Sequence, residues 1–392
     1  MQSSYVNPIP VLSTWVAKML TLGKKWAAWL DANPTAVLWE GGPEYYDGGR
    51  VYEQIASYTH DPTWLKYADI IHVAYADSII NLNGGLQGYN VFARGLLMGW
   101  QRTKNPKYLQ ALNVLAYGKS AATAYLSELR YFRQHGSPVS ASAPGLNPAW
   151  HQEYIREAAY IASAMICNEI VSGKRHPLLL TGVYDCIVPD LDAFMSPTGA
   201  TYLGKTVVNT YGVRTTGYVN NFMIGLALET LIEYYDLTGD AQIPPIVKTV
   251  LDFFWDYCVE QPASLLPKVN PKVKTPVPAS YAMYYNSDPV SGLDTVRDPK
   301  GIGVVNTASD LNQLVSPAYA WYGLHFDKSY WTKADELFQA GVLGAGTNCP
   351  LSKICQDYTF SGKEFSQNYK WSFDYVKWRN SGLNGGVGNG RT

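Results

Sequence analysis

Hydrophobic residues recur at helical spacing along most of this chain, in segments that end at short polar breaks. In Tyr89–Trp100 and Gly217–Tyr235 the apolar residues occupy almost every side of the helix. A helix of that kind is buried all round, whereas an amphipathic helix covers a core with one face. The pattern therefore predicts buried inner helices, each followed by an amphipathic outer partner.

The polar breaks resemble one another, which indicates an internal repeat. They read YTHDPTWLKYADII from Tyr58, RTKNPKYLQALNVL from Arg102, YDLTGDAQIPPIVKTVL from Tyr235 and HFDKSYWTKADELF from His325, with a looser copy from Ser172. In each, one helix ends at a Thr, Asn, Asp or Gly break and the next begins with a capping residue or a proline. Helical hairpins repeated in this way predict a mainly all-α fold, an α/α toroid that is closed or incomplete.

One domain is expected to contain nearly all of the 392 residues, because 47% of them are hydrophobic and only 16% are charged. We assign residues 1–380 to this domain and the Gly-rich residues 381–392 to a flexible tail. The loops 135–148 and 262–305 exceed ordinary connection lengths, which predicts functional loops over one face. Thr201–Val213 is expected to hold a few short strands.

The charge pattern limits the classes of partner. The formal net charge is −1 and no run of Lys and Arg occurs, so a nucleic acid is not expected. No apolar stretch reaches the length of about 18 residues that a membrane span needs. We expect a secreted or periplasmic protein whose leader is absent from this sequence, with the cytoplasm left open, and a monomer or homodimer.

The five cysteines fall into two groups. Cys349 and Cys355 lie in the short segment NCPLSKIC, where a disulfide is as plausible as free thiols. Cys167, Cys186 and Cys258 lie in apolar, helix-like surroundings and are expected to be buried thiols. No spacing fits a zinc site, and neither a metal nor a cofactor is expected.

Polar and aromatic residues gather where the inner helices are expected to begin. The candidates for substrate binding are Tyr45, Tyr46, Arg50, Gln87, Trp150, Asn221 and Tyr284. Aromatic rings supply core area as well as stacking platforms for sugars, so the 30 tyrosines and 12 tryptophans are expected to be mostly core. The aromatic residues in loops are the ones we expect to contact a sugar.

Asn90, His151 and Arg214 are spaced by about one hairpin each, which predicts equivalent positions on successive hairpins. Such a set suits β-elimination from a uronic acid, because the C6 carboxylate must be neutralised before the C5 proton can be removed. A tyrosine beside a cation can then serve as base and acid, and Tyr218 is the first candidate and Tyr285 the second. His151 as a helix cap and Arg214 as half of a surface ion pair remain open alternatives.

The segments YYDGGRVYEQIASYTHDP and GYVNNFMIGLALETLIEYYDLTGD, with the Asn/His/Arg/Tyr series, resemble the α/α-toroid polysaccharide lyases that act on alginate and glucuronan. The resemblance implies an anionic polysaccharide substrate, with Asn90, His151 and Arg214 neutralising its carboxylate and Tyr218 as acid and base. In one alginate lyase family an Asn precedes the His, whereas Trp150 precedes His151 here.

Three other functions compete with this interpretation. A glycoside hydrolase on the same scaffold would use a carboxyl pair, here Glu44 or Asp47 with Asp310. A sugar epimerase would need two opposed histidines, of which only His151 is well placed. A sugar-binding protein without catalysis would need the aromatic residues alone, and a fold by itself does not separate these functions.

Overall fold

The computed structural model describes residues 8–34, 42–86, 88–118, 154–195, 221–260, 309–344 and 361–383, with short segments between 201 and 220 and between 281 and 287. These residues are mostly helical, as the sequence predicts. The α-helices are α1 (Leu12–Ala32), α2 (Gly48–Thr59), α3 (Leu65–Asn81), α4 (Arg94–Thr103), α5 (Pro106–Tyr117), α7 (Tyr154–Ser172), α8 (Val188–Met195), α9 (Asn221–Thr238), α10 (Ile243–Tyr257), α11 (Ser316–His325), α12 (Tyr330–Gly344), α14 (Gly362–Tyr369) and α15 (Ser372–Leu383). Shorter turns of helix are η1 (Pro62–Trp64), η2 (Gly88–Asn90), η4 (Thr181–Ile187, a π-helix) and η5 (Ser309–Leu314).

The predicted hairpins are present as α2–α3, α4–α5, α9–α10 and α11–α12, and each pair is in contact. One Asp or Asn explains why the same break recurs in their sequences. In each link its side chain accepts a hydrogen bond from the backbone N–H two residues later, which is the usual way such a residue starts a helix or turn. These pairs are Asp61 with Thr63, Asn105 with Lys107, Asp240 with Gln242 and Asp327 with Ser329.

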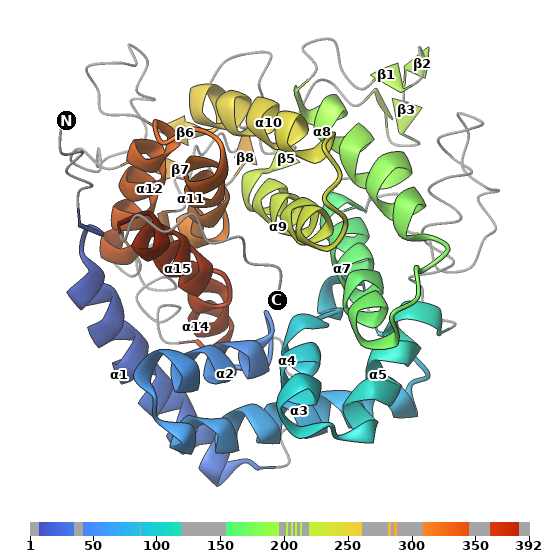
Figure 1. The fold of residues 1–392 in the computed structure, drawn as a ribbon, viewed down its shortest axis with the longest axis vertical. Helices are drawn as coiled ribbons and strands as arrows, with labels where there is room; N and C mark the ends of the chain where they lie inside the picture. The colour runs from blue at the N-terminus through green and yellow to red at the C-terminus, as the bar shows by residue number, and fades with distance from the viewer. Residues whose placement is uncertain are drawn as a thin grey trace.

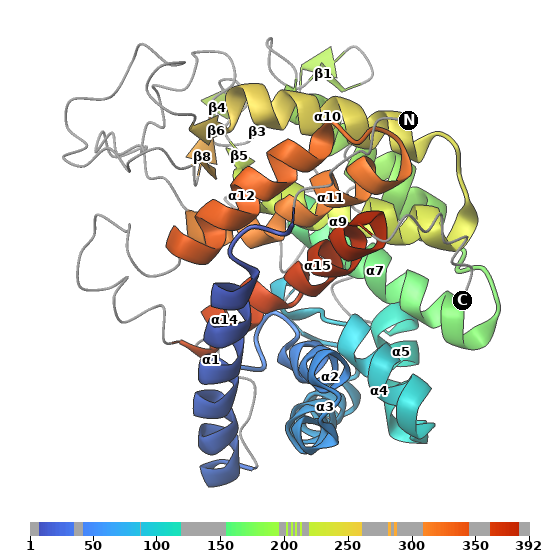
Figure 2. The same ribbon diagram turned by 60° about the vertical axis from the view of Figure 1, so that its left-hand side comes forward.

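The first helices of the hairpins form an inner set, α2, α4, α7, α9 and α11, to which the C-terminal helices α14 and α15 belong. Contacts run from α2 to α4, α7, α9 and α11 in turn, then to α15, and α14 contacts α2 again. Figures 1 and 2 show the chain passing around the molecule in this order, with α1, α3, α5, α10 and α12 outside. The inner helix α9 is buried from Asn221 to Tyr234, as its apolar pattern predicts.

Strands are few and short, as expected. Thr201–Val213 holds two antiparallel pairs, β1 (Thr201–Tyr202) with β2 (Lys205–Thr206) and β3 (Val208–Asn209) with β4 (Gly212–Val213). Two further antiparallel pairs join distant segments. They are β5 (Val219–Asn220) with β8 (Asn286–Ser287) and β6 (Val259–Glu260) with β7 (Ala282–Met283).

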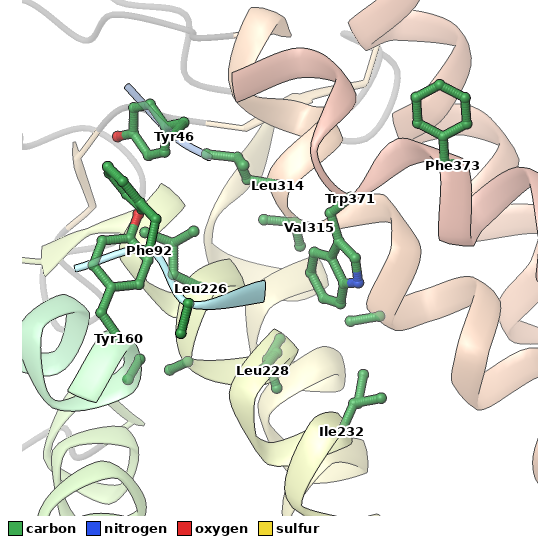
Figure 3. Close-up of a cluster of buried hydrophobic side chains, with 14 of the residues drawn as sticks. Tyr46, Phe92, Tyr160, Leu226, Leu228, Ile232, Leu314, Val315, Trp371 and Phe373 are labelled. Carbon is green, nitrogen blue, oxygen red and sulfur yellow. The ribbon is translucent and has the colours of Figure 1, made fainter. Parts of the chain in front are cut away.

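One continuous hydrophobic core joins all the helices, and aromatic rings form much of it. Trp15, Trp321 and Trp371 are fully buried, and Trp15 donates a hydrogen bond of 3.1 Å to Ser372 Oγ, which ties α1 to the start of α15. Figure 3 shows Trp371 packed among aliphatic side chains of the inner helices. The prediction that most aromatic residues are core is confirmed for the described residues.

Three further predictions can be compared with the structure. Cys167, Cys186 and Cys258 are buried cysteines, as predicted, whereas Cys349 and Cys355 lie outside the described residues. Helix α15 continues to Leu383, so residues 381–383, which we had assigned to the tail, are helical. Among the helices of the described ranges, none is long and apolar enough to cross a membrane.

Candidate functional site

The segment Tyr45–Arg50, which reads YYDGGR, makes a sharp turn into α2. Tyr46 and Asp47 both have left-handed backbone conformations, with φ of 60° and 64°. Non-glycine residues rarely adopt this conformation, and it costs on the order of 1 kcal/mol each. Strain of this kind is kept where the surroundings fix it, and it marks this turn as a place to look for function.

Close packing explains the two glycines of this turn. A Cβ on Gly48 would overlap the carbonyl of Pro43, and one on Gly49 would overlap the imidazole of His72 in α3. Burial lowers the pKa of His72 to about 3, so this histidine is neutral and serves packing. The glycines therefore let α2 approach its neighbours closely.

Asp47 joins the starts of two inner helices. Its Oδ2 accepts a hydrogen bond of 2.8 Å from the backbone N–H of Gly95, in the first turn of α4. The first N–H groups of a helix lack partners within the helix, so this carboxylate caps α4 from outside. Burial raises the pKa of Asp47 above its usual value, although Arg50 and Lys370 act against that effect.

A network of charged groups lies between the inner helices, which we call the central charge network: Arg50, Arg94, Glu229, Glu233, Lys370 and Asp374. Arg50 contacts Glu229 at 2.6 Å and Asp374 at 3.0 Å, and Lys370 contacts the other oxygen of Glu229 at 2.5 Å. Burial by itself would raise the pKa of Glu229, but Lys370 and Arg50 outweigh it and hold that pKa below its ordinary value. Glu229 is therefore ionised although it is buried.

Helix α9 carries two more carboxyl groups on the same face, one turn apart. Glu233 contacts Arg94 Nε at 2.9 Å and accepts a hydrogen bond of 2.7 Å from Ser163. Asp236 follows at the next turn. Its side chain is exposed, yet partial desolvation raises its pKa to about 6 in spite of the opposing charge of Arg94. Residues at i, i+4 and i+7 share one helix face, so Glu229, Glu233 and Asp236 lie in a row along α9.

Tyrosines from the segments that precede α2 and α4 meet an arginine and a tyrosine of the first two turns of α7. This tyrosine–arginine cluster consists of Tyr45, Tyr46, Tyr89, Arg156 and Tyr160. The Arg156 guanidinium lies 5.3 Å from the centre of the Tyr89 ring, and the rings of Tyr45 and Tyr46 are 4.8 Å apart. Burial would lower the pKa of Arg156, but Glu157, Tyr46 and Tyr160 raise it above its ordinary value, so it is a permanent cation.

Tyr160 differs from the other members of this cluster. It is 6% exposed, and its hydroxyl has no hydrogen-bond partner within the described part of the chain. Burial raises its pKa well above the usual value and outweighs the opposing effect of Arg156. Tyr160 is therefore a neutral phenol whose hydroxyl can donate a hydrogen bond. Figure 3 shows Tyr46, Phe92 and Tyr160 gathered on one side of the core.

A carboxyl pair lies at the start of α14. Asp310 in η5 has its pKa raised to about 6 by burial. Glu364 has its pKa raised to about 8, first by burial and then by the charge of Asp310. Two carboxyl groups held close together do not both ionise readily, and here their pKa values are pushed apart.

The structure describes five of the twelve predicted site residues. Tyr218, His151, Arg214, Tyr285, Gln87, Trp150 and Tyr284 lie outside the described residues. Asn90 belongs to η2, directly before α4, and its Oδ1 is buried without a hydrogen-bond partner in the described ranges. Asn221 is the first residue of α9 and is fully buried.

The other three predicted residues are covered by protein. Tyr45 and Tyr46 are 6% and 3% exposed, and their rings pack against each other and against Phe92, so little ring surface remains for a sugar. Arg50 is 4% exposed and pairs with two carboxylates, so it joins helices instead of facing a ligand. The sequence gives no sign of burial in these loop residues because their covering comes from distant segments.

Sequence reasoning missed Tyr160, Glu229 and Glu364. A signal for Glu229 was available, because an acid inside an almost entirely apolar helix has to be buried and paired. The structure also differs from the carboxyl pairs that the sequence predicted for a hydrolase, Glu44 or Asp47 with Asp310. Asp310 interacts with Glu364, while Asp47 caps α4.

Comparison with protein-family models, with curated proteins and with solved structures gives no match for this chain. In the residues that the structure describes, no group of three or more His, Cys, Asp or Glu side chains is arranged to hold a metal ion.

Proposed function

We propose that this protein is an α/α-toroid polysaccharide lyase that cleaves an anionic, uronate-containing polysaccharide of the alginate or glucuronan type. The observation that carries the proposal is the tyrosine–arginine cluster, where an arginine of α7 lies among tyrosines that precede α2 and α4. The contacts that lead from α2 through the inner helices and back to α2 support the toroid. The cluster lies at the helix starts, where substrate groups are expected to enter.

Elimination from a uronate needs three operations. The C6 carboxylate is first neutralised, so that the C5 proton becomes acidic. A base then removes that proton, the C4–O4 bond breaks as the C4–C5 double bond forms, and an acid protonates the departing O4. Asn90 and the cation Arg156 are suited to the first step. Tyr160, as a neutral phenol, is suited to donating a proton or hydrogen bond but not to being the base.

The roles of base and of further neutralising groups remain with the residues that the sequence predicts. These are Tyr218 or Tyr285 as base and acid, with His151 and Arg214 beside the carboxylate. In this proposal the protein uses no metal.

The first experiment is to incubate the protein separately with alginate, glucuronan and other uronate polysaccharides and to follow ultraviolet absorbance. Elimination creates a conjugated 4,5-unsaturated uronate that absorbs, whereas hydrolysis creates none. We expect absorbance to rise with one of these substrates and Tyr218→Phe to abolish the rise. The proposal fails if the wild-type protein gives new reducing ends without absorbance, or acts on none of the substrates.

A glycoside hydrolase is the second candidate, and the carboxyl pair favours it. With a pKa of about 8, Glu364 is protonated at neutral pH and suited to act as the acid, whereas Asp310, with a pKa of about 6, is mostly ionised. Separated pKa values of this kind accompany paired acid and base roles in glycosidases. In the assay above, reducing ends that disappear in Asp310→Asn would establish this second candidate, whereas a lyase should tolerate that change.

A further inference from the structure

A stripe of polar side chains runs along α14 and faces the tyrosine–arginine cluster. Lys363, Gln367 and Lys370 are four and three residues apart, which places them on one face of the helix and the turn that follows it. Lys363 Nζ lies 4.9 Å from the centre of the Tyr45 ring, and Lys370 Nζ lies 5.7 Å from the centre of the Tyr160 ring. Both ends of the stripe therefore contact the cluster, and Gln367 lies between them on the same helix face.

Two buried donors, one on this stripe and one beside its Lys370 end, lack partners. Gln367 is 4% exposed and Tyr160 is 6% exposed. Neither the Gln367 Nε2 nor the Tyr160 hydroxyl has a hydrogen-bond partner in the part of the chain that the structure describes. Buried polar groups in native proteins almost always have partners, since an unpaired donor loses its bonds to water and gains nothing. Two such donors, one on α14 and the other on α7 beside Lys370, indicate a missing acceptor.

The charges around these donors specify what kind of acceptor fits. Lys363, Lys370 and Arg156 come from these two elements, and all three carry positive charge next to the tyrosine rings. Lys370 also neutralises Glu229, and Arg156 contacts Glu157 at 2.6 Å. Hydrogen bonds to an ionised acceptor are about twice as strong as those to a neutral one, so a carboxylate is the best match for two donors among cations.

We propose that the Lys363–Gln367–Lys370 stripe and Tyr160 together bind the carboxylate of an acidic sugar, with Tyr160 and Gln367 donating hydrogen bonds to it. The inference rests on the proposed function for the class of ligand, but it concerns binding and needs no elimination step. Arg156 and Lys370 are positioning residues here, since each also holds a carboxylate of the protein.

The test compares melting temperatures with glucuronate, mannuronate or galacturonate, each against its neutral parent hexose at matched ionic strength. The wild-type protein should be stabilised by one uronate and not by the corresponding hexose, because ligand binding to the native state raises the melting temperature. Tyr160→Phe and Gln367→Leu should each weaken the binding of that uronate about tenfold or more, since each removes a hydrogen bond to a charged group. Tyr369→Phe, on the side of α14 that packs against Trp15, should bind as the wild type does.

The ligand-free proteins provide a second readout. Because the Tyr160 hydroxyl has no partner to lose, Tyr160→Phe should melt no lower than the wild type. A large fall in its melting temperature would mean that the hydroxyl has a structural partner, and the proposal would then be wrong. The proposal is also overturned if no uronate stabilises the wild type more than its hexose, or if both variants bind like Tyr369→Phe.

The two proposals can fail separately. If a uronate binds through Tyr160 and Gln367 but no polysaccharide yields an unsaturated product, the proposed carboxylate site is supported and the proposed lyase activity is wrong. If elimination proceeds equally well in Tyr160→Phe and Gln367→Leu, the proposed lyase activity is supported and the proposed carboxylate site is wrong.

Discussion

At the scale of single residues, desolvation and neighbouring charges together decide which acids are ionised. Glu229 is ionised because two cations contact it, while Asp236, at the next-but-one turn of the same face, has its pKa raised to about 6. The ordinary pKa of an aspartate is 3.8. In the window between these values the folded protein holds a proton that the unfolded chain has released. Stability that Asp236 contributes is therefore complete below about pH 4 and is lost as the pH rises through 6.

We expect Asp236→Asn to stabilise the protein at pH 7.5 by no more than about 1 kcal/mol, because Asp236 is exposed and solvent screens its charge, and to change little at pH 4, because the amide resembles the protonated acid. Denaturant unfolding of both proteins at several pH values measures the difference. Asp256→Asn, at another exposed position, on α10, is the matched control for removing a surface aspartate. A difference that stays constant from pH 4 to 7.5 would contradict the assigned pKa.

At the scale of elements, glycines set how closely the inner helices approach. Gly49 of α2 faces the neutral His72 of α3, and Gly95 of α4 faces the carboxylate of Asp47. An added methyl group has to displace a buried ring or carboxylate that is held from several sides. The two αL residues before α2 then fix the direction in which this helix enters the core.

Gly49→Ala should lower the free energy of unfolding by about 1–3 kcal/mol, since overpacking forces the His72 ring or the backbone to move. Chemical denaturation measures the loss. On the exposed side of the same helix, Ser57→Ala should change stability by no more than about 0.5 kcal/mol. Equal effects of the two substitutions would show that α2 and α3 have room to separate.

At the scale of the whole molecule, the central charge network joins segments that are far apart in sequence. Lys370, after α14, and Arg50, in α2, both hold Glu229 of α9, and Asp374 of α15 holds Arg50. The first and last hairpins are thereby tied to the middle of the chain. Removing one partner leaves a buried charge uncompensated, which costs more than the pair contributes.

Lys370→Met should destabilise the protein by about 3–5 kcal/mol, because Glu229 then keeps only Arg50. Glu229→Gln combined with Lys370→Met should cost less than the sum of the two single changes. A double-mutant cycle of unfolding free energies measures this coupling. Simple additivity would show that Lys370 and Glu229 act independently, against the contact of 2.5 Å.

The hairpins could be predicted from local sequence because their causes are local. Asp61, Asn105, Asp240 and Asp327 each start a new helix or turn through a bond to a residue two positions later, and the apolar pattern of α9 gives its burial directly. The three buried cysteines follow from the same local pattern. Of the candidate site, Asn90 and Asn221 were correctly placed before or at the start of inner helices.

The tertiary structure alone decided what those helices bring together. Arg50 and the Tyr45–Tyr46 pair looked available for a ligand, yet Glu229, Asp374, Phe92 and Lys363 cover them from other parts of the chain. The pairings of Lys370 with Glu229 and of Glu364 with Asp310 depend on how hairpins pack around the core. Helix periodicity and capping act over a few residues and can be read in order, whereas charge pairing and burial depend on distances in space.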